Sequence, residues 1–354
     1  MNKIAFLVHS EICISDDHQV GGGELSNYFL ILKLLDKFEI DVFPIKNISC
    51  NKSVSKPQDT FKVIKSKYSG QNRVSFFFQK IFFFKNRVSK IFKTKKYKYI
   101  VSTRSTLTIG NELSKKFNIP HVTIVRAYED FDGGILNKDT ESVYRRIDRF
   151  IYRNKTLEAF HNCYLIITNS NFMKNKILSV FPKLKVKISY PILGITANLK
   201  NIYEFNKIGF INRSSIKGDG LVKDLAKLMK DKTFFVFGKN LEGALSNNII
   251  NKGYISDRDL IFRSVDLFIV PSIWEEPYGR VASEAILSGI PVLVSKIGGL
   301  IEAAPNQLFW VNTLDPEEWK YKIKFFEKNI NLTLAAIKLS QEIINSYQHD
   351  EVLS

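Results

Sequence analysis

Two glutamates within residues 271–299 have a spacing that suits the binding of a phosphorylated sugar. Seven residues separate Glu276 from Glu284, and a Pro-Tyr-Gly turn at 277–279 precedes a helix that we expect to begin near Arg280. The first turn of a helix presents unpaired backbone N–H groups and a partial positive charge, which attract an anion. Carboxylates beside that turn accept hydrogen bonds from hydroxyls. The stretch therefore predicts a site for a phosphorylated sugar.

A basic pair follows another predicted strand. Arg213 and Lys217 lie in the sequence FINRSSIKGDG, directly after the strand expected at 207–211 and next to Gly218. A diphosphate leaving group develops negative charge as a glycosidic bond breaks, and cations held at a strand end stabilise that charge. A solvated loop is the alternative, because the chain has 52 Lys and Arg residues. The position after a strand favours the phosphate site.

Other interpretations of the two glutamates are a solvated helix face and the acid–nucleophile pair of a glycoside hydrolase. A solvated face is less consistent with the apolar neighbours of Glu276, which are Trp274, Pro277 and Tyr278. A hydrolase needs neither a phosphate-binding helix nor a basic pair. Transfer from an activated sugar accounts for more of these residues than hydrolysis does.

Strands and helices alternate in both halves of the chain, which predicts parallel sheets covered by helices. The first half opens with a strand at 3–9, a loop with Gly21 and Gly22, and a helix at 24–37. Further strands are expected at 39–45, 98–103, 121–126, 164–168, 207–211, 233–237, 251–255, 267–270 and 291–295. Residues 191–200 break this pattern and predict a linker. We expect an α/β protein with two Rossmann-like, doubly wound parallel-sheet domains.

Positive charge is concentrated in one segment. The net charge is +17, and between Lys46 and Lys98 the only acid is Asp59. Residues 74–99 combine an apolar helical face with basic residues, which fits either a core-packing helix with a basic outer side or a patch that docks on anionic lipid. Aromatic residues between basic ones also suit nucleic acid, but no recognised RNA- or DNA-binding motif is present, so no nucleic acid partner is expected.

Neither the cysteines nor the histidines have the spacing of a metal site. Cys13, Cys50 and Cys163 are scattered, and the five histidines form no cluster, so we expect no metal and a reducing cytosol. The apolar run near the N-terminus is too short for a signal peptide, and no run of about 20 apolar residues occurs. We expect a cytoplasmic protein, peripheral at the inner face of the cytoplasmic membrane if the basic segment docks there.

Residues 271–299, PSIWEEPYGRVASEAILSGIPVLVSKIGG, closely resemble the donor-binding signature of retaining GT-B glycosyltransferases of family 4, in which E-P-[FY]-G leads to a second Glu eight positions on. The similarity continues in the same order along most of the chain. Its other segments are GGGE at 21–24, RAYED at 126–130, NSNF at 169–172, RSSIKG at 213–218 and GYISDRDLIFRSVDLFIVPS at 253–272. The C-terminal motif is highly specific, whereas the N-terminal ones are individually weak.

The resemblance implies that the C-terminal half binds a nucleotide-diphosphate sugar. In this interpretation Glu284 holds the ribose hydroxyls, and Glu276 holds the transferred sugar with the backbone at Tyr278 and Gly279. The diphosphate is clamped by Arg213 and Lys217, and the base is bordered by Tyr254 and Ile255. No metal and no cofactor besides the donor substrate are implied.

For the N-terminal half, the resemblance implies that the loop at Gly21 and Gly22 faces the diphosphate across a central cleft, and that Arg126 lies near the sugar or the acceptor. Family members often carry His at this strand end, so Arg126 is a departure from the pattern. The implied domains are an acceptor-side domain at 1–195, a nucleotide-sugar-binding domain at 196–330, and a C-terminal helix at 331–354 that packs back on the first domain.

The resemblance and these residues together imply a retaining, metal-independent glycosyltransferase. We expect it to transfer a hexosyl or related group to a glycan or lipid-linked acceptor during synthesis of a bacterial surface polysaccharide, such as lipopolysaccharide or capsule. Retention is expected through same-face attack with help from the donor phosphate, so Glu276 is not assigned as a nucleophile. Two alternatives remain: a catalytically silent module that binds a sugar nucleotide, and a basic protein that binds nucleic acid.

Overall fold

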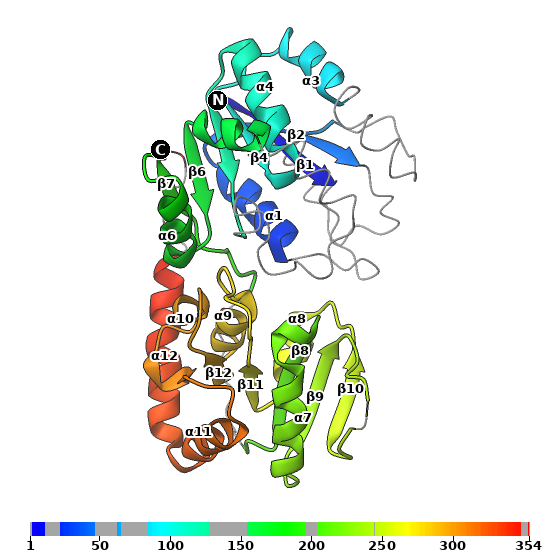
Figure 1. Cartoon of the computed structure of the whole chain (residues 1–354), viewed down its shortest axis with the longest axis vertical. Coiled ribbons are helices and arrows are strands. Elements are labelled where there is room, and N and C mark those ends of the chain that lie inside the picture. Colours follow the sequence, from blue (N-terminus) through cyan, green and yellow to red (C-terminus); the bar gives the residue numbers. More distant parts are fainter. Residues whose placement is uncertain are drawn as a thin grey trace. The chain divides into compact units, whose positions relative to one another are not determined.

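The computed structural model describes residues 2–10, 22–46, 62–64, 84–127, 154–195, 204–243, 245–347 and 353. Gly21, residues 74–83 and residues 128–130, which carry predictions from the sequence, lie outside these ranges. The chain divides into two compact units (Figure 1). The first comprises Met1–Asn169, Met173–Pro191 and Glu351–Ser354, and the second comprises Ser170–Phe172 and Ile192–Asp350.

A parallel sheet forms the centre of the first unit. Within the described ranges its strand order is β3-β2-β1-β4-β5-β6-β7. The strands are β1 Asn2–Ser10, β2 Phe38–Lys46, β3 Lys62–Val63, β4 Tyr99–Thr103, β5 His121–Ile124, β6 Leu165–Thr168 and β7 Val186–Ile188. The order reverses between β1 and β4. Open α/β sheets bind ligands at such a reversal, beyond the carboxyl ends of the strands.

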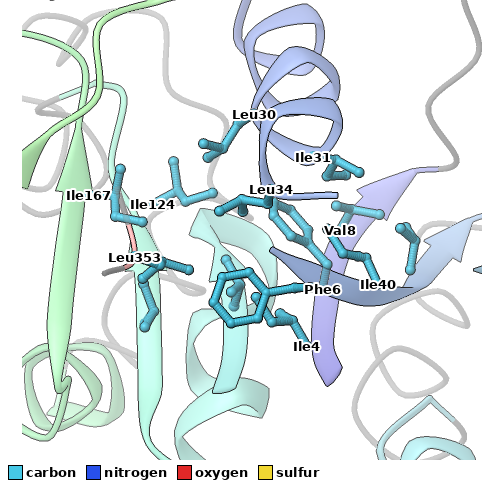
Figure 2. Close-up of a cluster of buried hydrophobic side chains, with 14 of the residues drawn as sticks. Ile4, Phe6, Val8, Leu30, Ile31, Leu34, Ile40, Ile124, Ile167 and Leu353 are labelled. Atoms are coloured by element: carbon cyan, nitrogen blue, oxygen red, sulfur yellow. The ribbon is translucent and has the colours of Figure 1, made fainter. Parts of the chain in front are cut away.

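Helices cover both faces of this sheet. They are α1 Gly22–Leu34, α3 Lys85–Phe92, the 3₁₀ turn η2 Arg104–Thr106, α4 Leu107–Phe117 and α6 Asn171–Val180. Alternate residues of β1 enter two different cores, because successive side chains of a strand point to opposite faces. One core joins Phe6 to α1, and Figure 2 shows Leu353 in this core beside Ile124 and Ile167. The other joins Leu7 to α3 and α4.

A buried histidine, His121, begins β5 and faces β4. His121 Nε2 is 2.7 Å from Ser102 Oγ, and its Nδ1 is 3.6 Å from the Cys163 Sγ atom. Gly110 leaves room for the ring, because a Cβ there would lie 2.5 Å from Nε2. Burial lowers the pKa of His121 from 6.5 to about 4, so the imidazole is neutral in the folded protein at pH 7.

We expect acid to destabilise the first unit through His121. Its folded pKa of about 4 is below the unfolded value of 6.5, so the unfolded chain binds the extra proton between these values. The stabilisation is complete above pH 6.5 and is lost as the pH falls toward 4. Between pH 7 and 5.5 the free energy of unfolding should decrease by about 1 kcal/mol. Urea unfolding at both pH values measures this.

His121→Gln should remove that pH dependence, whereas the same change at the exposed His161 should keep it. Equal slopes for wild type and His121→Gln between pH 7 and 5.5 would contradict the assignment.

The second unit is built on a second parallel sheet. In the described residues its strand order is β10-β9-β8-β11-β12-β13, with a reversal between β8 and β11. The strands are β8 Lys207–Asn212, β9 Thr233–Gly238, β10 Ile249–Gly253, β11 Leu267–Val270, β12 Val292–Ser295 and β13 Trp310–Val311. The helices are η5 Ser215–Lys217, α7 Asp219–Leu228, α8 Arg258–Arg263, α9 Arg280–Leu287, α10 Leu300–Ala303, η6 Gln307–Phe309, α11 Pro316–Lys328 and α12 Ile330–Ser346. The prediction of two doubly wound parallel sheets is confirmed.

The prediction for residues 331–354 needs correction. The helix α12 belongs to the second unit, where Gln341 Nε2 donates to the Ile286 carbonyl of α9 at 2.9 Å. Only Glu351–Ser354 group with the first unit, and Leu353 joins its core. The reason is local: a single residue, Asn329, separates α11 from α12, so α12 begins beside the helix that precedes it.

Candidate functional site

The loops after β8 and β11 are joined at the reversal point of the second sheet. Ile216, in the 3₁₀ turn after β8, accepts hydrogen bonds at its carbonyl from the backbone N–H of Ile273 at 2.9 Å and from Ser272 Oγ at 3.4 Å. These bonds fix the turn that carries Lys217 against the loop that carries Glu276. Two motifs that are about 60 positions apart in the sequence thereby form one site.

Lys217 and Glu276 form an ion pair in this site. The Lys217 Nζ atom lies 2.9 Å from Glu276 Oε1, and it lies over the Trp274 ring at 4.8 Å from the centroid. Glu276 is only 8% exposed, so its carboxylate depends on the lysine for charge compensation. The lysine is held at a defined position, by a carboxylate on one side and an aromatic face on the other. Such an ammonium is suited to a phosphate group.

Gly218 allows this turn to approach β11 closely. Its φ is +89°, and a Cβ at this position would lie 2.0 Å from the Pro271 carbonyl oxygen. Gly218 precedes α7, so the same residue ends the basic turn and starts the helix.

Gly218→Ala should therefore destabilise the second unit by about 2–3 kcal/mol, because the side chain would add both left-handed strain and a backbone clash. Gly220→Ala is a matched control two residues on, inside α7, where an added Cβ meets nothing within 4 Å. There alanine should be neutral or stabilise by up to about 1 kcal/mol. Chemical denaturation measures both, and equal effects would contradict the role of Gly218.

Glycines also shape the start of α9. Gly279, at φ +98°, precedes the helix, and the backbone N–H of Gly299 donates to the Glu276 carbonyl at 2.7 Å. A Cβ on Gly299 would lie 2.4 Å from the Pro277 carbonyl oxygen. Gly299 thus packs against the turn that carries Glu276. Small residues are needed here because two backbone segments touch.

The Tyr278 side chain is part of the core. It is 2% exposed, its Oη accepts a hydrogen bond from Ser283 Oγ at 2.9 Å, and burial raises the pKa of its phenol. Only the backbone at Tyr278 and Gly279 is therefore suited to contact a ligand.

Glu284 lies one turn further along α9, between two arginines. Its Oε1 accepts from Arg280 Nε at 3.1 Å and lies 3.0 Å from Arg280 Nη2, and its Oε2 lies 3.7 Å from Arg258 Nε. The carboxylate is 2% exposed. Sequence reasoning missed both arginines. The i,i+4 spacing of Arg280 and Glu284 on a predicted helix was a signal for the first, whereas Arg258 comes from another helix and has no local signal.

The remaining predicted residues of this unit are exposed or half-buried. Tyr254, 40% exposed, and Ile255 follow β10, and the loop that they begin leads into α8, which supplies Arg258. Arg213 is exposed and forms no ion pair or hydrogen bond with any residue that the structure describes. The structure thus joins Lys217 with Glu276 and Glu284 with two arginines, while no direct contact is found for Arg213, Tyr254 or Ile255 with these glutamates.

Two further predicted residues, Gly22 and Arg126, belong to the first unit. Gly22 begins α1, and its carbonyl accepts from Ser26 Oγ at 2.8 Å. Arg126, just after β5, donates from Nε to Asn27 Oδ1 at 2.9 Å and from Nη2 to the Ser26 carbonyl at 3.2 Å. Both lie near a cavity of about 270 Å³, whose lining includes Arg126.

No group of three or more His, Cys, Asp or Glu side chains in the described residues is arranged to hold a metal ion. No helix in the same ranges has the length and apolar character to cross a membrane.

The sequence around this site is similar to that of known proteins. Residues 176–343 match the family model for glycosyl transferases group 1. Over 137 residues, 35% of this chain, the sequence is 34% identical to an uncharacterised 42.6 kDa protein in the cps region of Klebsiella pneumoniae, and the match spans 36% of that relative's length.

Solved structures match nearly the whole chain. Sucrose-phosphate synthase from Thermosynechococcus elongatus superposes with a TM-score of 0.74 at 15% identity, covering 98% of this chain and 95% of that one. Anabaena HepE in complex with UDP-glucose gives 0.68 at 19% identity, with the same coverage. The fold is GT-B. The match to glycosyl transferases group 1 lies within this fold, at residues 176–343.

Proposed function

We propose that this GT-B chain transfers a sugar from a nucleoside-diphosphate donor to a glycan or lipid-linked acceptor. The main support for the proposal is the Lys217–Glu276 ion pair, which lies beside the start of α9. Glu284 lies in the same helix. The match of residues 176–343 to glycosyl transferases group 1 supports it, as does the UDP-glucose bound by HepE, a protein of the same fold.

Each residue has a proposed role in the donor complex. The Lys217 ammonium moves from Glu276 toward the diphosphate, and Arg213, exposed in the turn before it, adds the second charge. Glu276 is then able to accept hydrogen bonds from hydroxyls of the transferred sugar. Glu284, beside Arg280 and Arg258, accepts hydrogen bonds from the ribose hydroxyls. Tyr254 and Ile255 border the base. Positive charge aimed at the departing diphosphate stabilises the transition state.

Retention and metal independence belong to the same proposal. Lys217 and Arg213 supply the cationic charge that the leaving group needs, and the acceptor attacks the face that the diphosphate leaves, with a phosphate oxygen taking its proton. The anomeric configuration of the product, read by NMR, tests retention. An undiminished rate after treatment with EDTA tests metal independence, and loss of activity that added Mg²⁺ restores would contradict it.

A thermal-shift screen of nucleotide sugars tests donor binding. A donor at 100 times its Kd stabilises the folded protein by about 2.7 kcal/mol, or roughly 5–10 °C in Tm for a unit of this size. At least one nucleoside-diphosphate sugar should give such a shift, and its nucleoside monophosphate should give less. A donor shift without any transfer or hydrolysis would identify the silent binding module. Salt-sensitive binding of oligonucleotides, with no donor shift, would identify a nucleic acid-binding protein.

We further propose that the reaction serves synthesis of a surface polysaccharide at the inner face of the cytoplasmic membrane. The relative in the cps region supports the polysaccharide setting. Membrane contact is proposed for the basic segment. In its described part, Val88 and Phe92 of α3 pack in the core, while Lys90 and Lys93 are exposed. The core-packing interpretation therefore holds for the inner side of α3, and the lipid proposal rests on its outer side.

Reversing three charges tests the membrane proposal. The triple variant Lys90→Glu, Lys93→Glu and Lys96→Glu should lower affinity for phosphatidylglycerol vesicles by at least about 100-fold, since each lysine near an anionic surface contributes about 1 kcal/mol. Lys95 is left in place, because its Nζ lies 2.7 Å from the buried Asp41 Oδ2 and its loss would harm the fold.

The control for this experiment reverses three exposed charges of the second unit, at Lys227, Lys230 and Lys338. Vesicle sedimentation measures all three proteins. Equal loss of binding in both triple variants would show that net charge alone is responsible and would remove the docking role of α3.

A further inference from the structure

A short segment, Ser170–Phe172, groups with the second unit, although it precedes the rest of that unit in the sequence. It makes up three of the four residues of the NSNF motif at 169–172. The proposed donor complex gives this segment no role. Its hydrogen-bond partners lie in α10 and in the turn at 276–279, which we call the donor turn. The segment therefore contacts the part of the site that is proposed to bind the transferred sugar.

Ser170 is bonded directly to the donor turn. Its side chain is 0% exposed, and its Oγ donates a hydrogen bond to the carbonyl of Pro277, which is also buried. A hydroxyl has a single proton, so whatever the oxygen of Ser170 accepts, that proton is directed at the donor turn. A buried carbonyl that loses its partner costs free energy. The donor turn is thus held by a residue that lies 107 positions earlier in the chain.

Glu302 of α10 fixes the same segment through its backbone. The Oε2 atom of Glu302 accepts from the Asn171 N–H at 2.7 Å, and its Oε1 atom accepts from the Phe172 N–H, also at 2.7 Å. Both N–H groups belong to the first turn of α6, where a negative charge is favourable. Hydrogen bonds to an ionised acceptor are stronger than neutral ones. The position of Ser170 is therefore set by the carboxylate of Glu302.

The helix α10 is itself attached to the donor turn. The Glu302 N–H donates to the Gly299 carbonyl at 3.1 Å, and the Gly299 N–H donates to the Glu276 carbonyl at 2.7 Å. A Cβ on Gly298 would lie 2.7 Å from that same Glu276 oxygen, so the two backbones touch. The segment, the donor turn and α10 thus form a closed ring of hydrogen bonds. Any movement of the donor turn must break bonds to one of the other two members.

We propose that Ser170 and Glu302 are positioning residues, which hold the donor turn and the carboxylate of Glu276 in the geometry that binds the transferred sugar. The proposal rests on the proposed function, which assigns the sugar to this turn. A displacement of about 1 Å in groups that position a substrate is enough to lower activity strongly. The diphosphate is assigned to the basic turn after β8. Loss of either positioning residue should therefore weaken the sugar-specific part of donor binding and leave the diphosphate part unchanged.

Amide hydrogen exchange of the full chain, followed by NMR, tests the structural half without any ligand. The reporters are the N–H groups of Ala282 and Gly299, both bonded to carbonyls of the donor turn. In Ser170→Ala and Glu302→Gln their exchange should be faster by about 2- to 10-fold, the equilibrium effect of one net hydrogen bond. The Phe268 N–H, bonded at the start of the next strand, should keep its wild-type rate, because the opening is local. Equal acceleration at all three amides, or none, would overturn the proposal.

Calorimetry with paired nucleotides tests the functional half. The probes are UDP-, GDP- and ADP-sugars, each compared with its own diphosphate, UDP, GDP or ADP. For the pair that binds wild type most tightly, both variants should lower the ratio of sugar-nucleotide affinity to diphosphate affinity by about 2- to 10-fold. The affinity for the diphosphate alone should not change.

Two control variants match the chemical changes elsewhere in the second unit. Thr333→Val removes a buried hydroxyl that donates to the Asn329 carbonyl at 3.1 Å, and Glu318→Gln alters a carboxylate that accepts from the Asn312 N–H at 3.3 Å. Both controls should keep the wild-type affinity ratio. An equal fall in the controls would show that the ratio follows general stability, and the proposal would fail. Glu302 is half-buried, so Glu302→Gln should fold even if Ser170→Ala does not.

The two measurements separate this proposal from the proposed function. If a nucleotide sugar binds wild type and both variants keep the wild-type affinity ratio, the positioning role fails and the proposed function stands. If no nucleotide sugar binds wild type while exchange at Ala282 and Gly299 still depends on Ser170 and Glu302, the ring holds the turn and the donor assignment fails.

Discussion

Replacing Lys217 with alanine is expected to lower kcat for sugar transfer by about 10²–10³-fold, the usual effect of removing one group that stabilises charge in the transition state. The reason is the position of the Lys217 ammonium. Without donor, the Lys217 Nζ atom lies 2.9 Å from Glu276 Oε1 and over the Trp274 ring, so the ammonium is already at the site and moves only toward the diphosphate when the donor binds. Since the charge on the leaving group grows in the transition state, kcat should fall more than the affinity for the donor.

Lys227→Ala is the matched control, because this lysine is in the same unit, is exposed, and pairs only locally with Asp224 at 2.9 Å among described residues. Its kcat should equal that of wild type. Steady-state release of nucleoside diphosphate measures both variants, with denaturation curves to confirm folding. Wild-type kcat in a folded Lys217→Ala protein would remove the lysine from the mechanism.

The second large effect is expected at Glu284. Replacing it with alanine leaves Arg280 and Arg258 without their shared carboxylate, which should destabilise the second unit by about 3 kcal/mol. Any Glu284→Ala protein that folds should also lose the thermal stabilisation given by the donor, because the proposed acceptor of the ribose hydroxyls is gone. The exposed Glu242, changed to alanine in the same way, should show neither effect.

A double variant separates the two contributions of Glu284. Changing Arg280 to Met and Glu284 to Leu together removes the Arg280–Glu284 ion pair and fills its space, a replacement that often restores stability for buried ion pairs. Arg258, whose side chain is 27% exposed, keeps access to water in this variant. The double variant should therefore recover much of the stability lost by Glu284→Ala, yet should not regain the donor shift. Recovery of donor binding along with stability would show that Glu284 acts only in the fold.

Much of the fold was predictable because buried parallel strands have a strong local signal. The runs at 208–211 and 267–270 are continuous and apolar, and they form β8 and β11, which are adjacent in the sheet. The strands that were not predicted, β3, β7 and β13, have two or three residues each at the edges of their sheets. Strands this short owe their form to the neighbour with which they pair, which no local pattern records.

The candidate site was predictable in its members but not in its contacts. Sequence spacing indicated Glu276, Glu284 and Lys217 as charged residues of one site, but the pairing of Lys217 with Glu276 depends on backbone bonds between two distant loops. Arg258 reaches Glu284 from a separate helix for the same reason. Long-range contacts of this kind arise from the strand order, which composition and periodicity do not specify.

The most direct test of the central claim is release of nucleoside diphosphate from a sugar nucleotide, measured for wild type and Lys217→Ala at equal concentration. The proposal predicts steady release by wild type with at least one donor, faster when acceptor is added, and release lower by about 10²–10³-fold in the variant. Absence of release with every nucleoside-diphosphate sugar and acceptor offered, or equal release by the two proteins, would contradict it.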